Sequence, residues 1–211
     1  MNFKEKQAQL NAIYAGFEAA AREFKKEAVC RPGCAFCCTD VGSVDITTLE
    51  GLVIRDWLTG LSGKQKARMN KRLLRNRQAR EAQRVAECPF IAADHTCRIY
   101  AIRPFSCRQL YSLKKCGAQG PTVHRQAVAL AAETVKTLQR LDDTGYSGHM
   151  SVILHLLGQT DFRTLYRSGG FDPPQIMDFG KKHGILINRF AAEKERTTDG
   201  PSLTSLESLP V

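Results

Sequence analysis

Residues 30–38 read Cys-Arg-Pro-Gly-Cys-Ala-Phe-Cys-Cys and hold four of the eight cysteines of this chain. Cysteines used as small hydrophobic residues would be scattered, whereas thiolate ligands need short loops that gather several sulfurs around one ion. The pattern therefore predicts a metal-binding lobe. The predicted ligands are Cys30, Cys34, Cys37, Cys38, Cys88, Cys97, Cys107 and Cys116.

An even number of cysteines also fits four disulfides, and buried or reactive free thiols are a third alternative. The N-terminal residues 1–7 carry mixed charge and no apolar segment of the kind that directs export. We therefore expect a cytoplasmic protein, in which thiols stay reduced. With 211 residues and 43% hydrophobic composition, the chain can bury an ordinary core without covalent links. These observations favour metal over disulfides.

The number of sulfurs fits two four-coordinate ions or one polynuclear cluster, because zinc and iron–sulfur centres usually take four thiolates each. Cys37 and Cys38 are neighbours in the sequence, so their side chains point apart and should face different ions. We expect the two cysteine groups to interleave, with one ion taking ligands from both. In the alternative, one of this adjacent pair is a free, reactive thiol beside the metal.

The formal charge of +10 is consistent with ionised sulfurs, because eight thiolates and two divalent ions would reduce it to about +6. Arginines adjoin several cysteines and can stabilise thiolates, although they fit equally well as solvated cations. Nucleotide binding has no support, since the chain lacks both G-x-x-x-x-G-K and a strand-associated G-x-G-x-x-G. No apolar run reaches the length of a membrane helix, so we expect no membrane partner.

One stretch comprises residues 30–38, followed by Val44 and Glu50. A second stretch begins at Cys88, contains the run Cys97-Arg98-Ile99-Tyr100-Ala101-Ile102-Arg103-Pro104-Phe105-Ser106-Cys107-Arg108 and ends at Cys116. Together these two stretches resemble the YkgJ-type cysteine-cluster family. The resemblance implies a zinc- or iron-chelating domain in which all eight cysteines bind metal. The first group has three residues between its first two cysteines, where the family's shorter form has two.

Hydrophobic periodicity predicts a mainly α fold, with helices packed around the loop-rich cysteine lobe. Expected helices cover residues 3–28, about 47–59, 63–86, 121–143, 150–157, 162–166 and 174–182. Residues 41–45 and 185–187 favour a strand, and residues 145–148 should interrupt the helix that precedes them. We expect a single domain, residues 1–195, with its metal lobe in residues 30–50 and 88–116. The tail, residues 196–211, has the composition of a disordered segment.

Four further features carry predictions. The helix between Lys64 and Arg84 is strongly basic and could contact nucleic acid, but it lacks aromatic residues, so a solvated face or a protein-docking surface is favoured. His95 is expected to be exposed or to lie behind the ligands, and Glu50 to be structural. The Arg103-Pro104 pair should form a rigid turn that aims Cys107.

The function predicted from the sequence is zinc or iron chelation by eight thiolates. Zinc in closed sites would be structural. The first alternative is an iron–sulfur enzyme with redox or radical chemistry, which the same thiolates could serve. The second alternative is a zinc-supported protein associated with nucleic acid. Metal ions are the expected partners, and a protein partner is compatible with the pattern.

Overall fold

The computed structural model describes residues 2–41 and 43–193, and over these the chain is mainly α-helical, as predicted. Its α-helices are α1 Phe3–Ala20, α2 Thr48–Thr59, α3 Gly63–Glu81, α4 Phe105–Gln109, α5 Arg125–Leu141, α6 Met150–Leu156, α7 Thr160–Arg167, α8 Met177–His183 and α9 Asn188–Glu193. The strands are β1 Asp45–Thr47, β2 Tyr146–His149 and β3 Leu186–Ile187. The predicted disordered tail, residues 196–211, lies outside the described residues.

The first three long helices begin where the sequence indicates. The side chains of Asn2, Thr47 and Ser62 each accept a hydrogen bond from the backbone N–H three residues later. In return, the side chain of that later residue accepts a hydrogen bond from the backbone N–H of the first. These reciprocal bonds satisfy backbone donors that a helix start otherwise leaves open. Local chemistry therefore fixes the start of α1, α2 and α3.

The sheet corrects one prediction. Residues 145–148 were expected to be a simple break, but Tyr146–His149 form β2, the middle strand of an antiparallel sheet of order β1-β2-β3. Ile46 pairs with Gly148, and Tyr146 pairs with Ile187. A four-residue strand containing glycine has little local signal. Partners from distant parts of the chain supply its hydrogen bonds.

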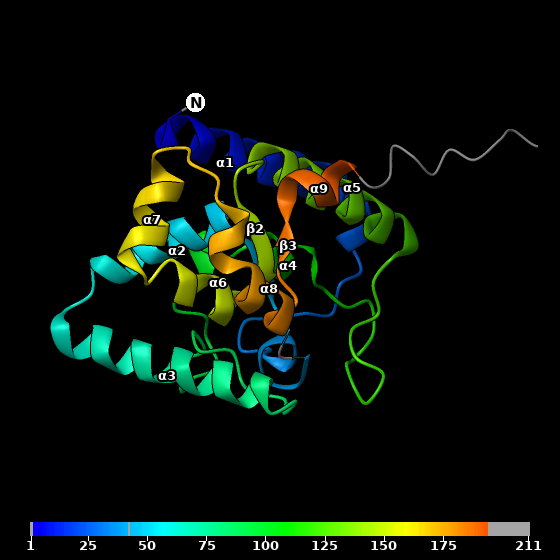
Figure 1. Cartoon of the computed structure of the whole chain (residues 1–211). Helices are drawn as coiled ribbons and strands as arrows, with labels where there is room; N and C mark the ends of the chain where they lie inside the picture. The colour runs from blue at the N-terminus through cyan, green and yellow to red at the C-terminus, as the bar shows by residue number, and fades with distance from the viewer. Residues whose placement is uncertain (1, 42, 194–211) are drawn as a thin grey trace, which may run out of the picture.

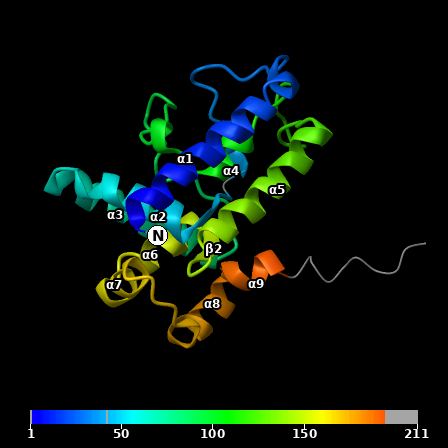
Figure 2. The same ribbon diagram turned by 90° about the horizontal axis from the view of Figure 1, so that it is seen from above.

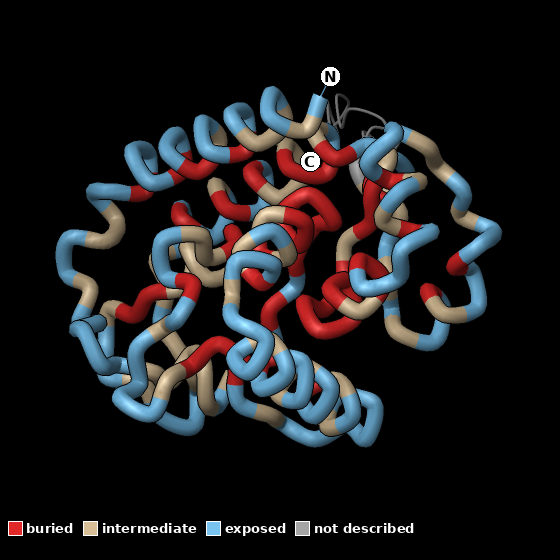
Figure 3. Tube along the Cα trace, turned by 90° about the vertical axis from the view of Figure 1, so that its left-hand side faces the viewer, coloured by how far each residue is buried: buried red, intermediate tan, exposed pale blue. Residues whose placement is uncertain are grey.

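Two hydrophobic clusters hold the helices together. In one, α1 lies against α5 and α4, with Leu10, Phe17 and Leu138 buried between them (Figures 1 and 2). In the other, α2 and α6 pack with the sheet around Leu52 and Ile153. Buried residues gather in the middle of the molecule, and exposed residues cover its outside (Figure 3).

Helix α3 lies along the edge of the molecule and packs on α6 (Figure 1). Of its own residues only Met69 and Asn76 are buried. The prediction that most of this basic helix contacts water is therefore confirmed.

The cysteine lobe consists of the segment between α1 and β1 and the segment between α3 and α5. The backbone N–H of Cys88 donates to the carbonyl of Cys38 at 2.7 Å, and Val29 N–H donates to Ser112 O at 2.8 Å. These bonds hold the two segments side by side. Residues 45–50, the end of the first predicted lobe segment, form β1 and the first turn of α2.

Candidate metal centre

All eight predicted ligands are free cysteines, and they come from both segments of the lobe. Four of them belong to the main hydrophobic core: Cys88 is buried in it, and Cys38, Cys97 and Cys107 pack against it. We call these four the inner quartet. The sulfurs of Cys38 and Cys88 share a hydrogen bond. Cys38 is also an electrostatic neighbour of Cys97 and Cys107, which means that its charge would raise the pKa of both thiols. The inner quartet thus combines one cysteine of the first group with three of the second.

The other four cysteines form the outer quartet, which comprises Cys30, Cys34, Cys37 and Cys116. Cys37 is an electrostatic neighbour of all three of the others, as well as of Cys38. Cys30 and Cys34 are exposed, whereas Cys37 and Cys116 are half-buried. The outer quartet therefore lies nearer the surface and combines three cysteines of the first group with one of the second.

Local backbone geometry separates the adjacent pair. A tight turn precedes it, in which Cys34 N–H donates to Arg31 O at 2.9 Å and Gly33 adopts a φ of +85°. Such a φ favours glycine, because a side chain there meets the backbone. Residues Cys37–Val41 then form a single wide π-helical turn. Successive side chains on a helical turn point in different directions, so Cys37 and Cys38 reach different neighbours.

Burial governs the protonation of these thiols. It raises the pKa of Cys107 to about 12 and that of Cys37 to about 11, and neighbouring sulfurs add to both increases. Within the hydrogen-bonded pair, the bond lowers the pKa of Cys38 and raises that of Cys88. The raised pKa values keep protons on Cys37, Cys88, Cys97 and Cys107 unless a cation replaces them, since a bound metal ion deprotonates the thiols that coordinate it.

The sulfurs are neighbours without forming a ready coordination shell. Across residues 2–41 and 43–193, no three His, Cys, Asp or Glu side chains stand close enough together to hold a metal ion as they are. The quartets are therefore defined by proximity, and ligation itself stays a prediction.

The arginines beside the cysteines divide into two roles. Burial raises the pKa of both Cys97 and Cys107, and the charge of Arg103 partly offsets both increases, as expected for a cation next to thiols. Arg108 instead ties the lobe to α1, because its guanidinium pairs with Glu18 at 2.7 Å and lies over the ring of Tyr14. Arg31 donates to two backbone carbonyls of its own turn.

Glu50 has the structural role that the sequence favoured. Its buried carboxylate accepts hydrogen bonds from Tyr14 Oη at 2.6 Å, Phe105 N at 2.7 Å and Thr47 N at 2.8 Å. It therefore joins α1, α2 and α4, and its bond to Phe105 anchors the short helix that carries Cys107. The sequence shows the capping pair Thr47 and Glu50. It gives no sign of the bond from Tyr14, because that partner lies in a distant helix.

The remaining predicted features are placed simply. His95 is exposed in a tight turn, with a φ of +63°. Pro104 precedes α4, and its carbonyl accepts a hydrogen bond from Cys107 N–H at 3.0 Å. The Arg103-Pro104 pair thus leads directly into the turn that positions Cys107.

No helix among the described residues is long and apolar enough to cross a membrane. Comparison of the chain with protein-family models, with curated proteins and with solved structures found no match in any of the three. The arrangement of the sulfurs is therefore the feature that indicates a function.

Proposed function

We propose that this chain is a metal-binding protein that holds two ions, one in the inner quartet and one in the outer quartet. The observation that carries the proposal is that the adjacent residues Cys37 and Cys38 have different sets of neighbouring cysteines. Cys38 neighbours Cys88, Cys97 and Cys107, whereas Cys37 neighbours Cys30, Cys34 and Cys116 as well as Cys38. Four sulfurs per ion is the number that zinc takes in closed structural sites.

The donor set fits the metals proposed. Thiolates select zinc, copper(I) and iron–sulfur clusters over hard cations such as magnesium. Loops carry most of these cysteines, so modest movements of backbone can close each quartet around an ion. Binding would replace the protons that burial holds on the sulfurs, which makes metal affinity dependent on pH.

Zinc is the leading metal, and iron or an iron–sulfur cluster is the alternative. The inner quartet packs against the core, so an ion there would chiefly stabilise the fold by joining the two segments of the lobe. A resident iron–sulfur cluster would supply electron transfer or radical chemistry. Membership of the YkgJ-type family and a cytoplasmic location are part of the same proposal.

The test begins with anaerobic purification, elemental analysis and a visible spectrum. About two zinc ions per chain and no colour are expected from the four-thiolate count. Iron with sulfide and a brown colour would select the alternative. A chain that binds neither metal, or one in which the cysteines form disulfides, would refute the proposal.

A pair of double variants tests how the sulfurs are divided. In Cys38→Ser/Cys107→Ser both changes fall in the inner quartet, so one ion should be lost and the other kept. In Cys107→Ser/Cys116→Ser the changes fall in different quartets, so both ions should be lost. Sites built from residues 30–38 and from residues 88–116 separately would give the reverse result. Far-UV circular dichroism of each variant checks that the helices remain.

A further inference from the structure

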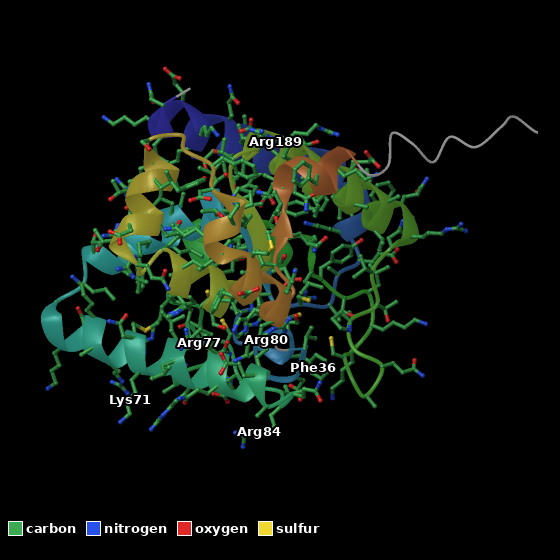
Figure 4. All side chains as sticks on the ribbon, in the orientation of Figure 1. Phe36, Lys71, Arg77, Arg80, Arg84 and Arg189 are labelled. Atoms are coloured by element: carbon green, nitrogen blue, oxygen red, sulfur yellow. The ribbon has the colours of Figure 1, made fainter. Side chains whose placement is uncertain are left out.

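A groove with a volume of about 660 Å³ lies beside the cysteine lobe, between the second half of α3 and the end of α8. Arg77 and Arg80 line it from α3, and Lys182 and His183 line it from α8. Figure 4 shows Arg77 and Arg80 extending from α3 towards the body of the protein, whereas Lys71 points away from it. Arg84 also lines the groove, from the turn that follows α3.

The lining is positively charged and only partly neutralised. Among its described residues the one carboxylate is Glu81, which lies 3.6 Å from Arg77 Nε and 3.8 Å from His183 Nε2. Arg80 and Lys182 form no ion pair with any carboxylate in the described parts of the chain, and Arg80 reaches only Ser43 Oγ, at 3.5 Å. The groove therefore has at least two cations whose charge is left for a ligand.

The same wall contains two buried polar atoms without hydrogen-bond partners, although one of them, Arg77 Nε, faces the carboxylate of Glu81 at 3.6 Å. Asn76 is 4% exposed, and its Oδ1 accepts no hydrogen bond, while its Nδ2 donates to Glu87 O at 2.9 Å. Arg77 Nε is buried and likewise has no hydrogen-bond partner. A buried polar group that lacks a hydrogen bond is destabilising. Buried polar groups without a partner are rare in native proteins, and a bound ligand or water that completes the site is one explanation for them.

We propose that this groove binds a small organic phosphate of about the size of a sugar phosphate or mononucleotide. Guanidinium groups bind phosphate oxygens through paired hydrogen bonds, and an ammonium adds a mobile point charge. The volume lies within the usual range for small-molecule sites, roughly 300–1,000 Å³. A hydroxyl group on the ligand would suit the acceptor on Asn76. This site does not depend on the metal proposal, because none of its lining residues is a cysteine.

The test is a titration of the full-length, metal-loaded chain, labelled with ¹⁵N, and followed by amide chemical shifts. The probes are ribose 5-phosphate and inorganic phosphate, which bind metal ions weakly. Saturable shifts are expected in residues 80–86 and 182–184. Tighter binding of ribose 5-phosphate than of inorganic phosphate identifies an organic ligand, and equal binding would reduce the site to one for free phosphate and overturn that part of the proposal.

A matched pair of variants separates the groove from the general charge of α3. Arg80→Gln/Lys182→Gln should weaken binding of ribose 5-phosphate by about tenfold, which corresponds to about 1.4 kcal/mol. Arg68→Gln/Lys71→Gln removes the same charge from exposed positions that do not line the groove, and should change affinity less than about twofold. Equal losses in both variants, no saturable shift, or tighter binding of an RNA oligonucleotide that both variants abolish would overturn the proposal.

Discussion

Replacing Tyr14 with Phe tests the buried junction at Glu50 that joins the helices to the cysteine lobe. The hydroxyl of Tyr14 donates to the Glu50 carboxylate at 2.6 Å, and both residues are buried. Burial and the adjacent carboxylate raise the pKa of Tyr14 well above its usual value, so the hydroxyl stays protonated and remains a donor at neutral pH. The substitution removes one oxygen and leaves the aromatic ring in place.

The expected loss of stability follows from the hydrogen bond that the Glu50 carboxylate loses when Tyr14 is replaced. A hydrogen bond to a charged group contributes about 1.5–3 kcal/mol, and a buried carboxylate that loses a donor cannot recover it from water. The bonds from Phe105 N and Thr47 N remain, so the junction is weakened without being abolished. We expect the free energy of unfolding to fall by about 2 kcal/mol. In a chain of this length that lowers Tm by roughly 4–8 °C.

Urea unfolding followed by far-UV circular dichroism measures the change, with the metal content of each sample determined beforehand. Tyr100→Phe is the matched control, because Tyr100 is 63% exposed and its hydroxyl has no hydrogen bond within the described part of the chain. That control should shift the free energy of unfolding by less than about 0.5 kcal/mol. If the Tyr14 variant is no less stable than the Tyr100 variant, the Glu50 junction does not hold the helices together as argued.

Two further predictions concern the core. Burial raises the pKa of Asp142 from 3.8 to about 7, so the folded state binds this proton more tightly than the unfolded state. The stability that this group contributes is therefore fully present below about pH 4 and falls until about pH 7, by up to about 4 kcal/mol. The difference between the urea midpoints of wild type and Asp142→Asn should change across this pH range. Parallel pH profiles of the two proteins would contradict the raised pKa of Asp142. Gly51→Ala should lower Tm through overpacking of about 1–3 kcal/mol, since a Cβ there would lie 2.8 Å from Leu157 Cδ1. Gly16→Ala, which meets nothing within 4 Å, should raise it or leave it unchanged.

Much of the helical structure was predictable because its signals are local. Apolar spacing indicated α1, α2, α3 and α5, and side chains three residues apart along the chain fix where the first three of them start. The set of eight cysteines was equally plain, as was their division into two groups in the sequence. The resemblance to a metal-chelating family depends on the same residues and stays a prediction.

The sequence alone determined the presence of α1, α2, α3 and α5, the starts of the first three, and the supply of sulfur. It placed the end of the first helix at residue 28, whereas α1 ends at Ala20. Only the tertiary structure decided which sulfurs are neighbours, that Tyr146–His149 is the middle strand of a sheet, and that Tyr14 and Phe105 meet at Glu50. It also brought Lys182 opposite Arg80 to form the basic groove. The physical reason is range: capping and helical periodicity act within a few residues. A strand pairing, a buried carboxylate and a four-sulfur group instead take their partners from distant segments, which meet only when the core forms.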